Sequence, residues 1–182
     1  MAFEKINGIR THYLVDGSKD CPTITFIHGQ AFDVGSWSRQ IDAFKDQFQV
    51  LRIDLRGHGL TEVGELGNDL RILNMAEDII AVWDHLEIKR SHYVGKSLGG
   101  MVGFDLALHN ADRLNSLTLV ATQGKMPCGS LDRMRRNAED YRKSPLKMKL
   151  AAGQLLSRYL PESYRKNDPT GYRLLEESIM QT

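Results

Sequence analysis

The feature that most constrains this chain is a regular alternation of short apolar runs with helical patterns through residue 122. Apolar, β-branched runs predict buried strands at 23–27, 49–53, 91–94 and 115–121. Apolar residues at helical spacing lie between these runs, at 36–48, 74–86 and 98–109. Such alternation is typical of a mostly parallel sheet flanked by helices, so we expect an α/β fold.

The two ends of the chain depart from this alternation. Residues 3–6 and 11–16 predict an opening hairpin, whereas 131–143, 145–160 and 170–180 carry only helical patterns, divided by prolines. Residues 1–120 have a net charge of −4, with 12 basic and 16 acidic side chains. Residues 121–182 have a net charge of +5, with 12 basic and 7 acidic side chains. We therefore expect an α/β core over 1–122 and a separate helical region over 123–182.

Composition excludes several classes of function. The net charge of +1 gives no reason to expect nucleic acid or a membrane as a partner. Cys21 and Cys128 form no CxxC pair, which argues against a disulfide framework and a cysteine-based zinc site. The N-terminus has no signal-peptide pattern, and no apolar run approaches 18 residues. We expect a cytoplasmic protein without a cofactor.

Gly95-Lys96-Ser97-Leu98-Gly99 matches G-x-S-x-G, with a predicted strand before it and a predicted helix after it. In this context the sharp turn lifts the serine hydroxyl above the sheet edge, where it can act as a nucleophile. The turn also places the backbone N–H of Leu98 at a helix N-terminus, free to donate to a developing oxyanion. Ser97 is therefore the candidate catalytic residue.

His28-Gly29-Gln30 ends the strand predicted at 23–27. An oxyanion hole requires a second N–H from a neighbouring loop, and the main chain of Gln30 is the natural donor. His28 itself is interpreted as a structural histidine that braces this loop. The loop that follows the next strand is expected at the same edge of the sheet.

Asp54-Leu-Arg56-Gly-His58-Gly59 follows the strand predicted at 49–53. Its alternating glycines predict a tight loop, which Asp54 and Arg56 could lock through backbone bonds or an ion pair. His28, His58 and Asp54 could in principle hold a metal, but no HExxH-type spacing supports that, and we expect no metal site.

Together these motifs resemble the α/β-hydrolase superfamily, in particular its cofactor-free esterases, enol-lactonases and C–C bond hydrolases. The resemblance rests, in order, on His28-Gly29, Trp37, Asp54-x-Arg56-Gly57-x-Gly59 and Gly95-x-Ser97-x-Gly99-Gly100. It covers residues 1 to about 122, and the helical region from about 126 resembles the start of that family's cap domain. Serine at the nucleophile position argues against the dehalogenases and epoxide hydrolases of the same fold, whose nucleophile is aspartate.

The resemblance implies that Ser97 attacks an ester or lactone carbonyl and that Gln30 and Leu98 hold the oxyanion. An acyl-serine would form and then be hydrolysed by water. The sequence departs from the family at Ala111-Asp112, where a proline is usual, and at Leu60-Thr61, where Gly-x-Ser is usual. Both departures affect local loops and neither removes a reacting group.

The partners of the serine are the missing part of this pattern. In this fold the acid and the histidine follow the nucleophile, yet no histidine follows His109. Of the histidines present, only His28 and His58 belong to the strand ends from which Ser97 emerges, with Asp54 near enough to orient one of them. Each is therefore a candidate substitute base, with a structural role as the alternative.

A sheet that ends at 115–121 would also leave an apolar edge strand with unpaired backbone groups. We therefore expect the last strands of the fold to be missing, the cap to be partial, and the edge to associate with a second copy or a completing second chain. Two functions remain open: a serine hydrolase of small esters or lactones, impaired if its acid and histidine are absent, and a non-catalytic or partner-completed binding protein.

Overall fold

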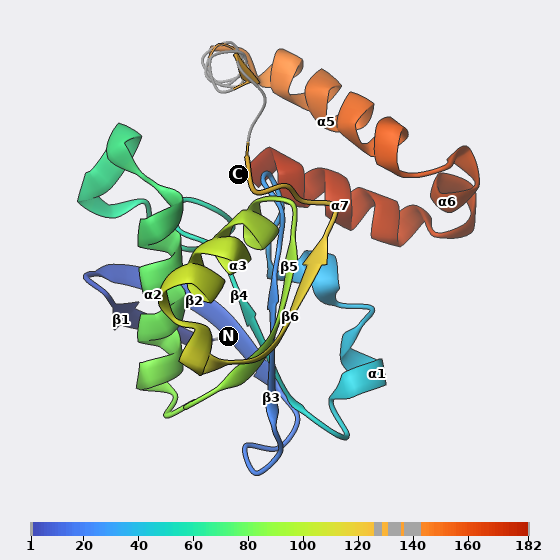
Figure 1. Cartoon of the computed structure of the whole chain (residues 1–182). Helices are drawn as coiled ribbons and strands as arrows, with labels where there is room; N and C mark the ends of the chain where they lie inside the picture. The colour runs from blue at the N-terminus through green and yellow to red at the C-terminus, as the bar shows by residue number, and fades with distance from the viewer. Residues whose placement is uncertain (1, 126–128, 131–135, 137–142, 182) are drawn as a thin grey trace. The chain divides into compact units, whose positions relative to one another are not determined.

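The computed structural model describes residues 2–125, 129–130, 136 and 143–181. They form two compact units, Met1–Gln123 and Gly124–Thr182, divided one residue after the predicted boundary. The first unit contains the sheet and the second is helical where it is described (Figure 1).

The described residues of the first unit contain a six-stranded sheet of order β1-β2-β4-β3-β5-β6. Its strands are β1 (Ala2–Ile6), β2 (Ile9–Asp16), β3 (Thr23–Ile27), β4 (Gln49–Ile53), β5 (Ser91–Lys96) and β6 (Leu114–Val120). The hairpin β1–β2 and the pair β2–β4 are antiparallel, whereas β3 pairs in parallel with β4 and β5, and β5 with β6. The predicted α/β class with a mostly parallel sheet is confirmed.

Helices α2 (Ile72–His85) and α3 (Leu98–His109) supply the larger apolar layer of the unit. Their buried faces pack with Trp83, Tyr93 and Leu106 in one cluster that also contains strand residues Leu51 and Ile53. A smaller cluster gathers Ile24, Phe26 and Val50 with partly buried aromatic residues from 37–48. Burial of apolar surface in these two clusters is the main stabilising contribution to the unit.

The single helix predicted at 36–48 is wrong. The structure has a short 3₁₀ helix, η1 (Val34–Trp37), and a four-residue helix, α1 (Ile41–Phe44). Asp33 caps η1 by accepting from the Gly35 N–H, and the Ser36 hydroxyl donates to the Asp33 carbonyl. The apolar residues at helical spacing are nevertheless packed, since Trp37, Phe44 and Phe48 contact the smaller cluster.

The start of α2 also differs from the sequence prediction. Asn74, the first residue of the predicted helix, lies inside α2, and its Oδ1 accepts the Arg71 N–H at 3.1 Å. Asp78, one turn further along α2, is 5% exposed and forms an ion pair with Arg56. Further short 3₁₀ segments are η2 (Gly64–Asp69), in a stretch for which the sequence predicts neither a strand nor a helix, and η3 (Ala111–Arg113).

The second unit contains α5 (Pro145–Tyr159), α6 (Glu162–Asn167) and α7 (Pro169–Gln181) among its described residues. Two prolines begin helices, where the missing N–H costs no internal hydrogen bond. The predictions for 145–160 and 170–180 agree with α5 and α7, α6 was not predicted, and most of 131–143 lies outside the described residues. No helix in the described ranges is long and apolar enough to cross a membrane.

Arg56 forms a buried two-pronged ion pair with Asp78 of α2. Its Nε and Nη2 donate to the two carboxylate oxygens at 2.7 and 2.6 Å, and both side chains are less than a tenth exposed. Asn7 of the β1–β2 turn donates to the same carboxylate at 2.7 Å. The pair therefore joins the loop after β4, the helix α2 and the opening hairpin.

We predict that Arg56→Met lowers the free energy of unfolding by about 3 kcal/mol, because it leaves the Asp78 carboxylate buried without its cation. Urea unfolding followed by circular dichroism measures the change. Lys45→Met is the control, since it removes an exposed pair with Asp42 and should leave the unfolding midpoint unchanged. A shift for Arg56→Met no larger than that of the control would contradict the prediction.

Candidate active site at the carboxyl edge of the sheet

Ser97 occupies a sharp turn between β5 and α3. Its backbone angles are φ 50° and ψ −109°, and its side chain makes no capping bond to the helix. Positive φ costs an L-residue roughly 1–2 kcal/mol, so the surrounding structure must hold this conformation. The turn matches the one predicted from the G-x-S-x-G motif.

Three hydrogen bonds hold the Ser97 backbone in this conformation. Its N–H donates to the Val120 carbonyl at 2.9 Å, and its carbonyl accepts from the Met101 N–H at 3.0 Å. The Thr122 hydroxyl donates to the same carbonyl at 2.6 Å. No local pattern predicts the role of Thr122, because it lies 25 residues from Ser97 and contacts it only once β6 is paired with β5.

Small residues permit the close approach of the chain at this turn. A side chain on Gly95 would collide with the Gly99 carbonyl, and a Cβ on Gly99 would lie 2.6 Å from the Ile27 carbonyl oxygen. A Cβ on Gly29 would lie 3.3 Å from Ser97 Cβ. The loop after β3 therefore passes directly beside the nucleophile position.

The two predicted oxyanion donors belong to these adjoining segments. The Gly99 N–H donates to the His28 carbonyl at 3.1 Å, which ties the first turn of α3 to the loop that contains Gln30. In the described part of the chain, the backbone N–H groups of Gln30 and Leu98 donate to no protein group. Free N–H groups of this kind can stabilise a negatively charged oxygen.

His28 is fully buried, and both of its ring nitrogens contact the backbone. Nδ1 donates to the Gly29 carbonyl at 2.8 Å, and Nε2 accepts from the Leu55 N–H at 3.0 Å. This pattern fits the neutral ring, and burial lowers the pKa of His28 from 6.5 to about 3. Because neither nitrogen is available to a serine proton, the contacts favour the structural role over that of a base.

His58 lies beside His28, with 5.4 Å between the ring centroids. Its Nδ1 is 3.2 Å from the Arg56 carbonyl, and burial lowers the pKa of the ring below its usual value. His58 therefore has a neutral ring at pH 7, as a base requires. The two candidate substitute bases differ, since only in His28 are both nitrogens bound to the backbone.

Asp54 lies at the centre of this edge and is 1% exposed. One carboxylate oxygen accepts the Val34 N–H at 2.7 Å, and the other accepts from the Leu60 N–H at 3.0 Å and from His12 Nδ1 at 2.7 Å. Burial raises the pKa of Asp54, and these hydrogen bonds oppose that rise. Its contacts are structural, and His28 Nε2 is 3.9 Å away.

Backbone strain concentrates around Ser97. Of the five non-glycine residues with positive φ among those described, Ala31 follows Gln30 and Ala121 precedes Thr122. Both therefore belong to segments that hold the nucleophile or carry an oxyanion donor. Such clustering is typical of functional sites, where the surrounding structure maintains a strained geometry.

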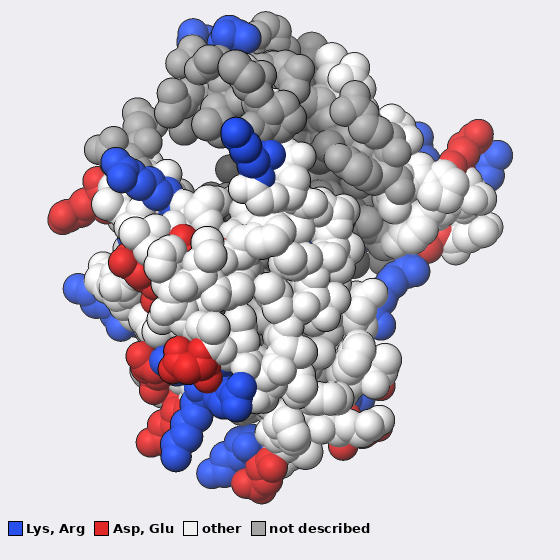
Figure 2. All heavy atoms as spheres, in the orientation of Figure 1, with Lys and Arg blue, Asp and Glu red and all other residues white. Residues whose placement is uncertain are grey.

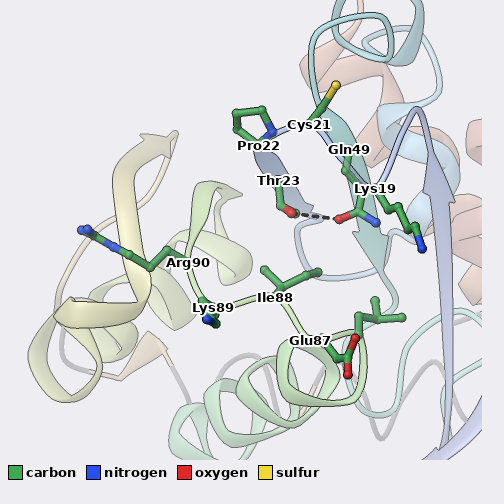
Figure 3. Close-up of a pocket in the computed structure, with 10 residues that line it drawn as sticks. Lys19, Cys21, Pro22, Thr23, Gln49, Glu87, Ile88, Lys89 and Arg90 are labelled. Carbon is green, nitrogen blue, oxygen red and sulfur yellow. Dashed lines mark hydrogen bonds between the residues drawn. The ribbon is translucent and has the colours of Figure 1, made fainter.

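A hollow of about 460 Å³ lies at the opposite end of the strands (Figure 3). Its lining includes Thr23 and Gln49, which begin β3 and β4 and are hydrogen-bonded to each other at 2.9 Å. Parallel strands carry reactive groups at their carboxyl ends, so this hollow is separate from the Ser97 site. No group of three or more potential metal ligands occurs among the described residues.

A family model described as "alpha/beta hydrolase fold" matches residues 22–151. The chain belongs to this family. The match includes the loop of Gln30, the segment of Asp54 and the turn at Ser97, so the resemblance predicted from the motifs is confirmed.

Three relatives indicate which branch of the family is similar. The chain is 32% identical over 112 residues to 3-oxoadipate enol-lactonase 1 of Acinetobacter baylyi, a match that covers 62% of this chain and 41% of that protein. The solved enol-lactonase of Burkholderia xenovorans LB400 superposes with a TM-score of 0.88 at 27% identity, over 100% of this chain and 68% of that one. A thermophilic esterase of Thermogutta terrifontis gives 0.87 and 26%, over 99% and 67%. The chain therefore spans about two fifths of the sequence relative and two thirds of the solved ones.

The lowered pKa of His28 predicts a specific pH dependence of stability. The unfolded state binds a proton near pH 6.5 and the folded state only near pH 3, so protonation favours unfolding between these values. His28 should therefore reduce the free energy of unfolding by up to about 1.4 kcal/mol for each pH unit below 6.5. Urea midpoints between pH 4.5 and 7.5 should fall less steeply for His28→Gln, which keeps a donor and an acceptor, and equal slopes would contradict the prediction.

Proposed function

We propose that this chain is a serine hydrolase of carboxylic esters or lactones, with Ser97 as its nucleophile. The observation that carries the proposal is the strained backbone of Ser97 between β5 and α3, beside a loop with a free N–H. Relatives named as enol-lactonases and an esterase support the substrate class. A small ester or lactone would be the partner of the site.

In the proposed reaction Ser97 Oγ attacks the substrate carbonyl carbon and loses its proton to a base. The electron pair of the carbonyl moves to oxygen, where the N–H groups of Gln30 and Leu98 stabilise it. Collapse of this intermediate expels the alkoxide, which takes up a proton, and leaves an acyl ester on Ser97. Water then attacks that ester, releasing the carboxylic acid and restoring the hydroxyl.

The base that accepts the serine proton is the part of this mechanism with the fewest candidate residues in the chain. Both nitrogens of His28 are engaged, and no histidine follows His109 in the sequence. We propose that acylation of Ser97 outpaces hydrolysis of the acyl-serine in this chain, with His58 as the internal candidate for a base. Without an efficient base both steps are slow. A reactive ester with a good leaving group still acylates Ser97, whereas attack of water on the acyl-serine depends on the base, so deacylation is the slower step.

We predict that a fluorophosphonate probe labels the wild-type chain and that Ser97→Ala abolishes labelling. With p-nitrophenyl acetate, about one equivalent of p-nitrophenolate per chain should appear as a burst, followed by slow turnover. Mass spectrometry should locate the acetyl group on Ser97. Lys89→Met, at an exposed position near the opposite strand ends, is the control and should label like the wild type.

The outcomes separate the two functions that the sequence leaves open. Absence of labelling in the folded wild-type chain would contradict the hydrolase and favour a non-catalytic binding protein. A burst that persists in His58→Ala, with an unchanged slow phase, would remove His58 as the internal base. Steady turnover without a burst would contradict the proposal that deacylation is limiting.

A partner that completes the sheet is a second part of the proposal. In the described residues β6 lies at the end of the strand order, with Thr118 and Val120 exposed. Figure 2 shows that the face over α3 and β6 carries few charged side chains. We propose that β6 pairs with a second copy or with another polypeptide, since an open edge favours association.

We predict that light scattering after size exclusion gives a mass above 20.6 kDa for the purified chain, rising with concentration. Thr118→Lys should shift the distribution toward the monomer, because an edge lysine opposes strand pairing. A wild-type chain that remains monomeric at every concentration would contradict self-association and leave a second polypeptide as the partner to be sought.

A further inference from the structure

Lys96 places a cation next to the nucleophile position. It is the last residue of β5 and directly precedes Ser97. Residues on the other side of the strand, Tyr93 and Gly95, face α3, where the Tyr93 hydroxyl donates to the Gly99 carbonyl. Alternation therefore directs Lys96 away from α3 and toward the loop after β3.

The Lys96 ammonium is 4.8 Å from the centroid of the Phe32 ring. Phe32 is buried and belongs to the loop of the oxyanion donor Gln30. A Cβ placed on Gly29 would lie 3.3 Å from Ser97 Cβ and 4.0 Å from Phe32 Cδ2, so Gly29 is adjacent to both side chains. The ring under the ammonium is therefore within the immediate surroundings of the nucleophile.

Among the residues that the structure describes, no acid pairs with the charge on Lys96. Over the described ranges no carboxylate pairs with its ammonium, whose contact is the face of Phe32. Burial lowers the pKa of Lys96, and no neighbouring acid opposes that effect. A half-buried cation of this kind gains more from an arriving anion than a solvated surface lysine does.

We propose that Lys96 is a specificity-determining residue that binds a carboxylate carried by the ester or lactone substrate. The inference rests on the proposed function, and it assigns the substrate class: monoanionic esters or lactones rather than neutral ones. A single ammonium held on an aromatic face matches one negative charge. Lys96 binds the substrate and takes no part in proton transfer.

The first test compares two p-nitrophenyl esters that differ only at the end of the acyl chain: the hexanoate, which is neutral, and the hydrogen adipate, which ends in a carboxylate. We expect Lys96→Met to lower kcat/KM for the adipate about tenfold to a hundredfold and for the hexanoate by less than about threefold. Lys96→Arg should retain most of the preference, and Lys89→Met is the matched control. Equal losses on both esters would overturn the inference and leave Ser97 as the nucleophile.

A second measurement does not require turnover. In a Ser97→Ala background, equilibrium binding of monomethyl adipate should exceed that of methyl hexanoate, and adding Lys96→Met should remove the difference. Charge-dependent binding together with an unlabelled wild-type serine would contradict the proposed function while supporting the Lys96 inference. Binding that does not depend on the carboxylate would overturn the inference whatever the labelling shows.

Discussion

The buried carboxylate of Asp54 is the interaction on which the carboxyl edge of this sheet depends. It accepts hydrogen bonds from β2, from the first residue of η1 and from the loop after β4. The next residue, Leu55, donates its N–H to His28 and so fixes the loop that contains Gln30. One side chain and its neighbour thus determine the path of three loops, and removing a single oxygen would leave buried donors unpaired.

Around Asp54, neutral and charged side chains have different electrostatic roles. His28 is held neutral between two backbone groups, and His58 lies against it with a lowered pKa. Two cations of this region are Arg56, which is paired with Asp78, and Lys96, which contacts Phe32. A neutral histidine pair avoids adding charge beside an oxyanion site. The Lys96 ammonium, which has no carboxylate partner among the described residues, creates a local preference for anions.

The parts of the structure that the sequence predicted are those with local signals. Strand limits, the turn at Ser97 and the order of the three loops follow from apolar runs and glycine positions within a few residues. The failures involve distant partners: η1 begins at Val34, whose N–H donates to Asp54, 20 residues away, and the apolar spacing in 36–48 carries no sign of that contact. Likewise, neither the His12–Asp54 pair nor the Thr122 bond has a local pattern, since each depends on which strands become neighbours.

The attachment of Ser97 to β6 has a mechanical consequence. The Val120 carbonyl and the Thr122 hydroxyl both come from the last strand in the order or directly after it, and both bond to the Ser97 backbone. Edge strands open more readily than central ones, so local fraying of β6 would release the positive φ of the nucleophile. The lifetime of the reactive geometry is thereby coupled to amide exchange along β6, and whatever occupies that edge also steadies the serine.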